Sequence, residues 1–397
     1  RIDDRAASPH LGGMSSVTRL LQCLVSTPSV NPALPGEPDI LGEHRMTALL
    51  DGWLAGCGFE TKRVETVPGR PSLVATFGPD KPGRTLMIEG HLDTVAVAGM
   101  TIDPFSGEER DGLVWGRGAC EMTGPMAAAL DAMDDEVLAA FRASDRRLMF
   151  VGAIDEEIGA KGARMLADLG IGADEAIVLE PTGGDIVTAH KGPAWMFVTL
   201  RGRAGHGSNP AGGVNAIDAA AELIPRLHEL HRSLQPATPH ALLGLPTLNI
   251  GRIQAGTAAN VIPDECRIDI DRRVLPGDSA APMVALVCAE LERMQTAGRI
   301  TGFEMSTYEA PSFQTPADGP LVRRLAAASR AHGVEPRVLG TSWFSDAGAF
   351  SRTCREIVVF GPGHIAQAHT RDEFIDVPDL LRARAILKDL MLDFARA

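Results

Sequence analysis

The stretch Leu86-Met87-Ile88-Glu89-Gly90-His91-Leu92-Asp93 joins an apolar, strand-like run to a histidine and an aspartate. A short apolar run of this kind is typical of a strand buried in an α/β sheet. In open α/β sheets the ligand site lies outside the carboxyl ends of the strands. The stretch therefore predicts a strand that carries His91 and Asp93 to the functional edge of a sheet.

Three more apolar runs in the chain end in residues that can bind a metal ion. They are 148–151, followed by Asp155-Glu156-Glu157; 176–179, followed by Glu180; and 357–360, with His369 beyond. Imidazole and carboxylate groups bind hard or borderline divalent metals. One such run means little, but four strand ends that meet at one edge predict a shared site with metal-assisted chemistry.

The composition argues against several classes of partner. The chain has 397 residues, of which 45% are hydrophobic and 22% charged, enough for a sizeable core and more than one domain. Its net charge of −13 disfavours binding to nucleic acid or to an anionic membrane surface. No apolar run approaches the roughly 20 residues of a membrane span, and no signal segment opens the sequence. We therefore expect neither nucleic acid nor a membrane among the partners.

Six cysteines, none of them in a CxxC pair, are sparse for a chain of this length. This usage indicates reduced thiols and a cytoplasmic protein. Cys120 stands beside a candidate metal ligand, and we expect it to be a packed thiol. Residues 1–13 are polar and precede Met14, so we interpret them as a leader segment outside the fold.

Helix-like and strand-like patterns alternate from Met14 to about Gly192 and resume after residue 310. This alternation predicts βα units, an α/β fold class and a mostly parallel sheet. The predicted helices are 17–25, 42–57, 125–143, 320–331 and 378–395, and the predicted strands include 72–77 and 85–88. Residues 14–192 and 310–397 would thus form the two parts of one catalytic domain.

Residues 193–309 have a different order: strand, helix, strand, strand, helix, strand. We expect the strands at 195–200, 247–253, 265–274 and 303–308, and the helices at 213–234 and 279–294. This is the order of a ferredoxin-like α+β unit. The sequence therefore predicts a smaller domain inserted into the catalytic domain.

Asp155, Glu156 and Glu157 place three carboxylates at one strand end. Their repulsion is costly unless cations neutralise it or one carboxyl group stays protonated for acid–base work. Neighbouring residues in an extended chain face opposite ways, so Glu156 and Glu157 can divide proton transfer and metal binding between them. A metal-bound histidine usually donates its other ring N–H to a carboxylate or carbonyl, a role open to Asp93 beside His91.

These residues belong to a longer, ordered series of motifs. In the main part the series is Gly90-His91-Leu92-Asp93-Thr94, Gly116-Arg117-Gly118-Ala119-Cys120-Glu121-Met122, Asp155-Glu156-Glu157-Ile158-Gly159, Glu180-Pro181-Thr182 and Ala368-His369-Thr370. In the insert it is Gly205-His206-Gly207-Ser208, Gly213-Val214-Asn215-Ala216-Ile217, Asn260-Val261-Ile262-Pro263 and Arg273-Val274-Leu275-Pro276. With this series the chain resembles, from Met14 onward, the M20 family of metallopeptidases and amidohydrolases. That family includes acetylornithine deacetylase, succinyl-diaminopimelate desuccinylase, aminoacylase and glutamate carboxypeptidase.

The resemblance implies a metal centre built from five residues. The implied ligands are His91 and Glu180 for one divalent ion, Glu157 and His369 for another, and Glu121 as the bridge between them. Histidine and carboxylate ligands without cysteine fit zinc, and also manganese or cobalt. By the same resemblance Glu156 would be the general base and Asp93 would orient His91.

The resemblance also implies a function for the inserted domain, as a lid that mediates a homodimer. In this lid His206 would stabilise an oxyanion, often in the partner's site. Asn260 and Arg273 would hold the substrate carboxylate or polarise its carbonyl.

One position departs from the family pattern. The bridging residue is normally Asp followed by Met-Lys-Gly-Gly, whereas this chain has Glu121-Met122-Thr123-Gly124-Pro125. Glu is one methylene longer, which shifts the bridging oxygens by about 1.5 Å unless the backbone compensates. The change leaves open whether the site holds one ion or two, and whether the substrate is an unusual one.

Simpler roles remain open for several residues. His206 could be a turn histidine between two glycines, Asn260 could close a turn, and Arg273 could form a surface ion pair. Near the fifth ligand position, the spacing favours His369 over His364. Candidates for lining the pocket in the last loop region are Thr341, Ser342 and Asp346.

The main functional hypothesis is metal-dependent hydrolysis of an amide C–N bond in a small carboxylate-bearing molecule, an N-acyl amino acid or a dipeptide. Glu156 would take a proton from water and return it to the leaving amine. The unusual Glu121 suggests an alternative within this class, hydrolysis of an aromatic amine, as in nitroanthranilate aminohydrolase. An alternative from another class is a metal- or ligand-binding pseudoenzyme whose bridging position has decayed.

Overall fold

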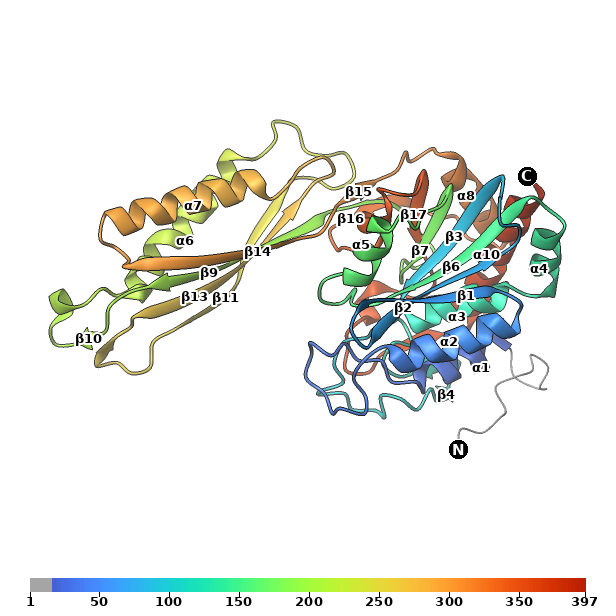
Figure 1. Cartoon of the computed structure of the whole chain (residues 1–397), viewed down its shortest axis with the longest axis horizontal. Coiled ribbons are helices and arrows are strands. Elements are labelled where there is room, and N and C mark those ends of the chain that lie inside the picture. The colour runs from blue at the N-terminus through green and yellow to red at the C-terminus, as the bar shows by residue number, and fades with distance from the viewer. Residues whose placement is uncertain (1–15) are drawn as a thin grey trace. The chain divides into compact units, whose positions relative to one another are not determined.

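The computed structural model of the chain describes residues 16–397 (Figure 1). The predicted leader segment, residues 1–13, lies outside the described residues. The chain divides into two compact units. Unit 1 contains residues up to Thr188, 314–339 and 345–397, and unit 2 contains Ala189–Phe313 and Gly340–Phe344. Within residues 16–397, no helix is both long enough and apolar enough to cross a membrane.

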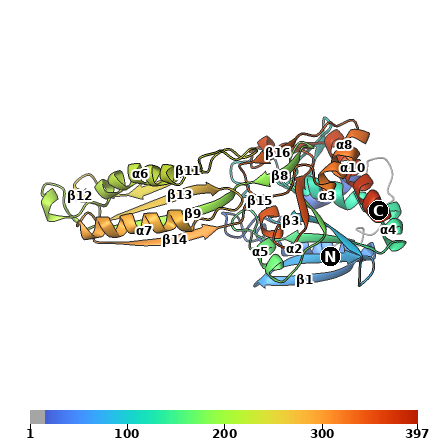
Figure 2. The ribbon, with the colours of Figure 1, turned by 90° about the horizontal axis from the view of Figure 1, so that it is seen from above.

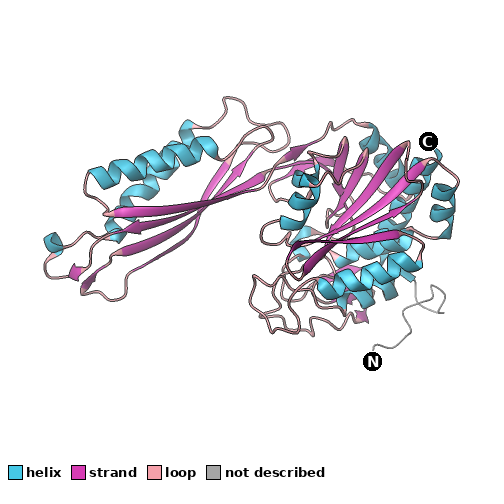
Figure 3. Ribbon diagram, viewed as in Figure 1, coloured by secondary structure: helices cyan, strands magenta, loops and turns pink. Residues whose placement is uncertain are grey.

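Unit 1 is built on a large β-sheet with helices packed on it (Figure 3). Its helices are α1 Ser16–Val25, α2 His44–Gly56, α3 Thr123–Ala132, α4 Asp135–Arg142, α5 Lys161–Asp168, α8 Pro320–Ala331, α9 Ala347–Phe350 and α10 Val377–Arg396, with the short 3₁₀ helix η2 Ile365–Gln367. The nine strands of the large sheet are β1 Glu60–Val67, β2 Arg70–Phe77, β3 Arg84–His91, β6 Arg146–Ala153, β7 Glu175–Leu179, β8 Ile186–His190, β15 Phe313–Gln314, β16 Val338–Thr341 and β17 Glu356–Phe360. A small sheet contains β4 Glu109–Arg110, β5 Leu113–Trp115 and β18 Phe374–Asp376.

The strand order of the large sheet is β1-β2-β6-β3-β7-β17-β8-β15, with β16 paired to β8. The four central strands β6, β3, β7 and β17 are parallel, whereas β1, β2 and β8 pair in antiparallel fashion. β1 and β2 form a hairpin whose turn passes through Gly69 with a φ of 73°, a value that favours glycine. The predicted α/β class is therefore confirmed, and the sheet is a mixed one with its parallel strands at the centre.

Helices cover the central strands, which are therefore buried and mostly apolar. All five residues of β7 are buried, as are the last seven residues of β3. One large apolar cluster joins these strands to α1, α2, α3, α4, α8 and α10, and Phe150 of β6 and Phe360 of β17 are fully buried in it. Burying an aromatic side chain of this kind contributes roughly 1.5–3 kcal/mol to folding.

The single helix predicted over residues 125–143 is wrong, because the structure has two helices there. α3 ends at Ala132 and α4 begins at Asp135. Between them Asp134 has extended backbone angles, and its side chain accepts hydrogen bonds from the N–H groups of Glu136 and Val137. Aspartate favours such an N-cap position because it satisfies N–H groups that lack partners at the start of a helix.

Unit 2 has the predicted order of strands and helices. Its elements are β9 Gly192–Arg201, β10 Gly205–His206, η1 Pro210–Gly212, α6 Ala216–Ser233, β11 Thr247–Ala255, β12 Val261–Ile262, β13 Glu265–Val274, α7 Ala281–Thr296 and β14 Gly302–Glu309. The antiparallel sheet has the order β11-β13-β9-β14, and α6 and α7 lie on one of its faces (Figure 2). β10 and β12 form a separate two-stranded ribbon.

Candidate metal centre

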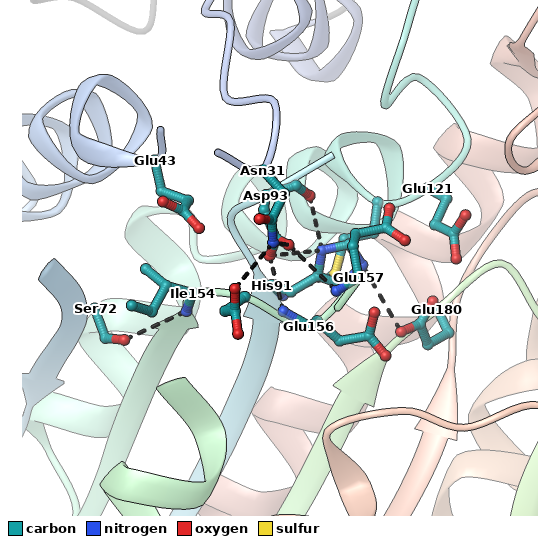
Figure 4. Close-up of polar contacts among 12 residues, drawn as sticks. Asn31, Glu43, Ser72, His91, Asp93, Glu121, Ile154, Glu156, Glu157 and Glu180 are labelled. Carbon is teal, nitrogen blue, oxygen red and sulfur yellow. Dashed lines mark hydrogen bonds and ion pairs between the residues drawn. The ribbon is translucent and has the colours of Figure 1, made fainter. Parts of the chain in front are cut away.

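The four strand ends singled out in the sequence are neighbours in the sheet. β6, β3, β7 and β17 lie side by side in this order and run parallel, so their carboxyl ends share one edge. His91 is the last residue of β3, Glu180 follows β7, and Glu156 and Glu157 follow β6. Figure 4 shows the side chains of these residues gathered together with Glu121.

His91, Glu121 and Glu180 form the first of two ligand groups. One side-chain ligand atom from each lies within 4.8 Å of the others, and all three residues are buried. The loop between β5 and α3 supplies Glu121. We call His91 and Glu180, with the shared Glu121, the first half-site.

Glu121, Glu157 and His369 form the second ligand group, also within 4.8 Å. Nε2 of His369 lies 2.7 Å from Oε2 of Glu121 and 3.1 Å from Oε2 of Glu157. Burial lowers the pKa of His369, but its hydrogen bonds to the two carboxylates outweigh this effect and raise the pKa to about 11. When no ion is bound, the raised pKa favours a protonated His369 between these carboxylates. We call Glu157 and His369, with the shared Glu121, the second half-site.

The donor atoms of the first half-site fit a divalent metal. Nε2 of His91 and Oε2 of Glu180 are buried and have no hydrogen-bond partner among residues 16–397. Nε2 of His91 lies 4.0 Å from Oε1 of Glu180, which is too far for a hydrogen bond. Two atoms that bind the same ion, each about 2 Å from it, can be separated by up to about this distance. Burial and the carboxylates of Glu121 and Glu157 raise the pKa of Glu180 well above its usual range. A bound cation would relieve this repulsion.

Glu156 lies beside the ligand carboxylates but belongs to neither group. Burial, followed by the negative charges of Glu180 and Asp346, raises its pKa well above the usual range. Its backbone N–H donates to Oδ1 of Asp93 at 3.0 Å. A carboxyl group with a raised pKa, held next to a metal centre, is suited to proton transfer.

Asp93 contacts His91 in a way that differs from the expectation. Nδ1 of His91 lies 2.9 Å from the backbone carbonyl oxygen of Asp93 and 3.7 Å from its carboxylate, so the carbonyl accepts the ring N–H. The carboxylate accepts instead from the N–H groups of Glu156 and Glu157 and from the amide of Asn31, at 3.0, 3.2 and 2.7 Å (Figure 4). Asp93 therefore orients His91 through its backbone and fixes the Glu156–Glu157 loop through its side chain.

Two residues that the sequence analysis missed hold this site in place. The buried Asn31 donates to Asp93 and to Asp155. Glu373, fully buried, accepts from Arg117 and from the backbone N–H groups of Cys120 and Glu121. Neither residue stands in a strand-end pattern, although Glu373 follows His369 by four positions.

The remaining candidates of this region are placed as follows. The Cys120 thiol is buried and donates to the carbonyl of His364 at 3.4 Å, and burial raises its pKa, as expected for a packed thiol. His369 is the histidine that joins the second ligand group, and His364 does not belong to it. Asp346 is buried in unit 1 at the start of α9, whereas Thr341 and Ser342 belong to unit 2.

The three lid candidates all lie in unit 2, at opposite ends of its sheet. His206 pairs with Val261 in the small ribbon, and the N–H of Gly207 donates to the carbonyl of Asn260 at 2.8 Å, so His206 and Asn260 are close neighbours. This ribbon adjoins the Glu265 end of β13, and Arg273 stands eight residues further along the strand. At about 3.4 Å per residue in an antiparallel strand, the separation is roughly 27 Å. Within one unit, Arg273 therefore cannot contact the ligand that His206 contacts unless that ligand is long.

Arg273 forms an ion pair within its own strand. Its Nε lies 3.0 Å from Oδ1 of Asp271, which also accepts from the indole of Trp195. The guanidinium is partly exposed. To bind a substrate carboxylate, Arg273 must therefore either bind it together with Asp271 or release Asp271.

A parallel sheet edge with two overlapping His–carboxylate groups and a neighbouring carboxyl group of raised pKa is the arrangement of a metal-dependent hydrolase. Residues 87–393 match the model of peptidase family M20/M25/M40. The chain therefore belongs to this family of metal-dependent hydrolases.

Known proteins with similar sequence and structure agree with this membership. Acetylornithine deacetylase of Edwardsiella ictaluri is 31% identical over 392 residues, which cover 96% of this chain and 99% of that protein. The M20 family metallo-carboxypeptidase Sso-CP2 from Sulfolobus solfataricus has a TM-score of 0.79 at 20% identity, over 97% of this chain and 100% of its own. The YXEP protein of Bacillus subtilis, a dinuclear metal-binding peptidase of the M20 family, has a TM-score of 0.66 at 18% identity, over 96% and 98%. The metal-dependent hydrolysis of amide bonds predicted from the sequence is thereby confirmed at the level of the family.

Proposed function

We propose that the chain hydrolyses the amide bond of a small carboxylate-bearing molecule, an N-acyl amino acid or a dipeptide, with two divalent ions. The carrying observation is that Glu121 belongs to both ligand groups, so it can bridge two ions despite its extra methylene. In this proposal His91 and Glu180 hold the first ion, and Glu157 and His369 hold the second. Zinc suits this donor set best, and manganese or cobalt also fit it.

In the proposed hydrolysis, the metal ions and the side chains of the chain have different roles. Bound divalent ions lower the pKa of a water molecule and polarise a carbonyl. Glu156 accepts a proton from the attacking water and delivers it to the leaving amine, tasks for which its raised pKa suits it. Asp93 keeps Glu156 in place through the backbone N–H of that residue.

The positions of His206 and Arg273 within unit 2 support a proposed homodimer. Residues 193–309 would form the lid and dimerisation domain, inserted between catalytic segments 14–192 and 310–397. Nδ1 of His206 accepts the N–H of Ser208 at 3.1 Å, so in the neutral ring Nε2 carries the proton and can donate to an oxyanion. His206 and Arg273 stand roughly 27 Å apart along the unit 2 sheet, and they could serve one small substrate if each came from a different copy. We also propose a cytoplasmic location, which the six free thiols support.

A substrate panel tests the proposed activity. The protein loaded with zinc, manganese or cobalt is assayed on N-acetyl amino acids that include acetylornithine, on dipeptides, and on aminobenzoates. We expect turnover on one of the first two groups. Turnover on aminobenzoates alone would support aromatic-amine hydrolysis, and full metal occupancy without any turnover would support a binding protein.

Mixed dimers test the sharing of residues between copies. Glu156→Gln and His206→Ala are each expected to be nearly inactive alone. If His206 serves the partner's site, co-expressed dimers recover about a quarter of wild-type activity, because half of the dimers are mixed and each has one complete site. No recovery in dimers shown to be mixed by mass spectrometry would place His206 in its own chain's site, and a monomer in sedimentation would remove the dimer proposal.

A further inference from the structure

Glu373 connects two of the three loops that carry ligands of the second half-site, those of Glu121 and His369. It lies four residues after His369, immediately before β18, and its side chain reaches the loop that carries Glu121. β18 pairs with β5, with Phe374 opposite Trp115, and the N–H of Gly116 donates to the backbone carbonyl of Glu373 at 3.0 Å. The pairing of β5 with β18 therefore ends next to residues 117–121, which the Glu373 side chain contacts.

The Glu373 carboxylate is fully buried and accepts four hydrogen bonds from this one loop. Oε1 accepts the N–H groups of Cys120 and Glu121 at 2.9 and 3.0 Å, and Oε2 accepts Nη1 of Arg117 and the N–H of Gly118 at 2.6 and 3.2 Å. Successive backbone N–H groups that converge on one anion form a rigid nest. The last N–H of the nest belongs to Glu121 itself, so the carboxylate fixes the backbone position of the bridging ligand.

We propose that Glu373, held by Arg117, is the positioning residue that makes the second metal ion bind. The proposal rests on the two-ion function above and deepens it. Glu373 fixes Glu121 through the nest, and it fixes the segment that returns from His369. The second ion depends on both of these ligands. The first ion keeps His91 and Glu180, which β3 and β7 of the central sheet hold without Glu373.

Replacing Glu373 by glutamine tests whether this residue positions the ligands of the second ion or only stabilises the fold. Glu373→Gln keeps the shape of the side chain but replaces one acceptor oxygen by an NH₂ group, which would then face N–H donors. The matched control is Glu356→Gln, because the Glu356 carboxylate accepts the N–H of Leu321 at 2.7 Å and stands at the first residue of β17, the end opposite the site. Arg117→Lys serves as a milder variant, since it leaves the three backbone N–H groups on Glu373 and loses only the fork geometry of the guanidinium.

Each protein is freed of metal and titrated with Co²⁺, followed by visible absorption and calorimetry, with no assay of turnover. Wild type and Glu356→Gln should bind two ions. Because the first ion also uses Glu121, its affinity should fall by no more than a few-fold in Glu373→Gln. The affinity for the second ion, which depends on His369 as well, should fall by about 10- to 100-fold, with a smaller fall in Arg117→Lys.

The outcomes separate this inference from the proposed function. Wild-type protein that binds fewer than two ions would disprove the two-ion function itself. Two ions bound by wild type and equally well by Glu373→Gln would disprove only the role of Glu373. An equal loss of both ions would assign Glu373 a merely structural role and overturn the inference. If Glu373→Gln does not fold, the same criteria apply to Arg117→Lys, in which a selective loss of the second ion supports the inference.

Discussion

The two half-sites of the metal centre differ in how the fold holds their ligands. In the first, His91 ends β3 and Glu180 follows the neighbouring β7, and their side chains are only 1% and 3% exposed. In the second, Glu157 and His369 come from loops, and the His369 side chain is 49% exposed. The central sheet therefore fixes the first half-site directly, whereas the second depends on loop contacts. This difference predicts one tightly held ion and one that exchanges with solvent.

Glu156 provides the largest expected effect, because it lies beside both half-sites and binds neither ion in our proposal. Glu156→Gln keeps the size of the side chain and removes the proton acceptor. Turnover should fall by about 10²- to 10⁴-fold. Metal content measured by mass spectrometry should stay at the wild-type level in both half-sites. Near-wild-type turnover would remove Glu156 as the general base, and a loss of metal would make it a ligand.

Replacing one histidine at a time tests directly whether the two half-sites hold their ions differently. A chelator should strip the wild-type protein in two phases, the faster one from the more exposed second half-site. His369→Ala should abolish the fast phase and leave one ion per chain, whereas His91→Ala should remove the slow phase. Stopped-flow chelation with a chromogenic chelator measures both rates. A single phase in the wild type, or the same phase lost in both variants, would contradict the distinction between the half-sites.

That His91 and Glu180 meet at one edge of the sheet could be predicted from the sequence for a physical reason. Buried parallel strands are near-continuous apolar runs, and a polar residue at the end of such a run must lie at the sheet edge. His91 and Glu180 follow this rule directly, and the structure places both at that edge. Loop-borne residues follow this rule poorly: His369 stands well beyond the apolar run 357–360, and Glu121 was found only through the family resemblance.

Other features could not be predicted because they depend on contacts between residues distant in sequence. Asn31 meets Asp93 across 62 positions, and Glu373 meets Glu121 across 252. The strand β1 was missed because it forms the edge of the sheet, where few residues need to be apolar. The break between α3 and α4 depends on a single N-cap, Asp134, in a stretch of good helix formers.

The protonation of His369 tests how the metal-free second half-site is stabilised. Its pKa is raised from the usual 6.5 to about 11, so the metal-free protein should carry an imidazolium here at pH 8. Because the folded-state pKa is the higher one, the stabilisation is fully present below pH 6.5 and is lost as the pH rises through about 11. Metal ligation requires the neutral ring, so added zinc should displace this proton at pH 8.

Imidazole ¹⁵N NMR spectra at pH 8, recorded before and after zinc addition, measure this change. The matched control is His231 of α6, whose pKa is lowered by burial and by Arg272, so it should stay neutral throughout. A His369 ring that is already neutral at pH 8 without metal would show that the two carboxylates do not hold a cation in the metal-free protein.

Asn31 gives the smallest expected effect, since it contacts no proposed metal ligand side chain. Its amide donates to Asp93 at 2.7 Å and to Asp155 at 3.1 Å, and all three residues are buried. Asn31→Ala leaves both carboxylates without this donor and should lower the free energy of unfolding by about 1–3 kcal/mol, measured by urea denaturation. Because Asp93 holds His91 through its backbone and Glu157 through its side chain, the loosened Asp93 should disturb the second half-site more than the first. Chelation rates of the variant check this: a faster fast phase with an unchanged slow phase is expected. Acceleration of the slow phase alone would mean that the first half-site also depends on side-chain contacts distant from the central sheet.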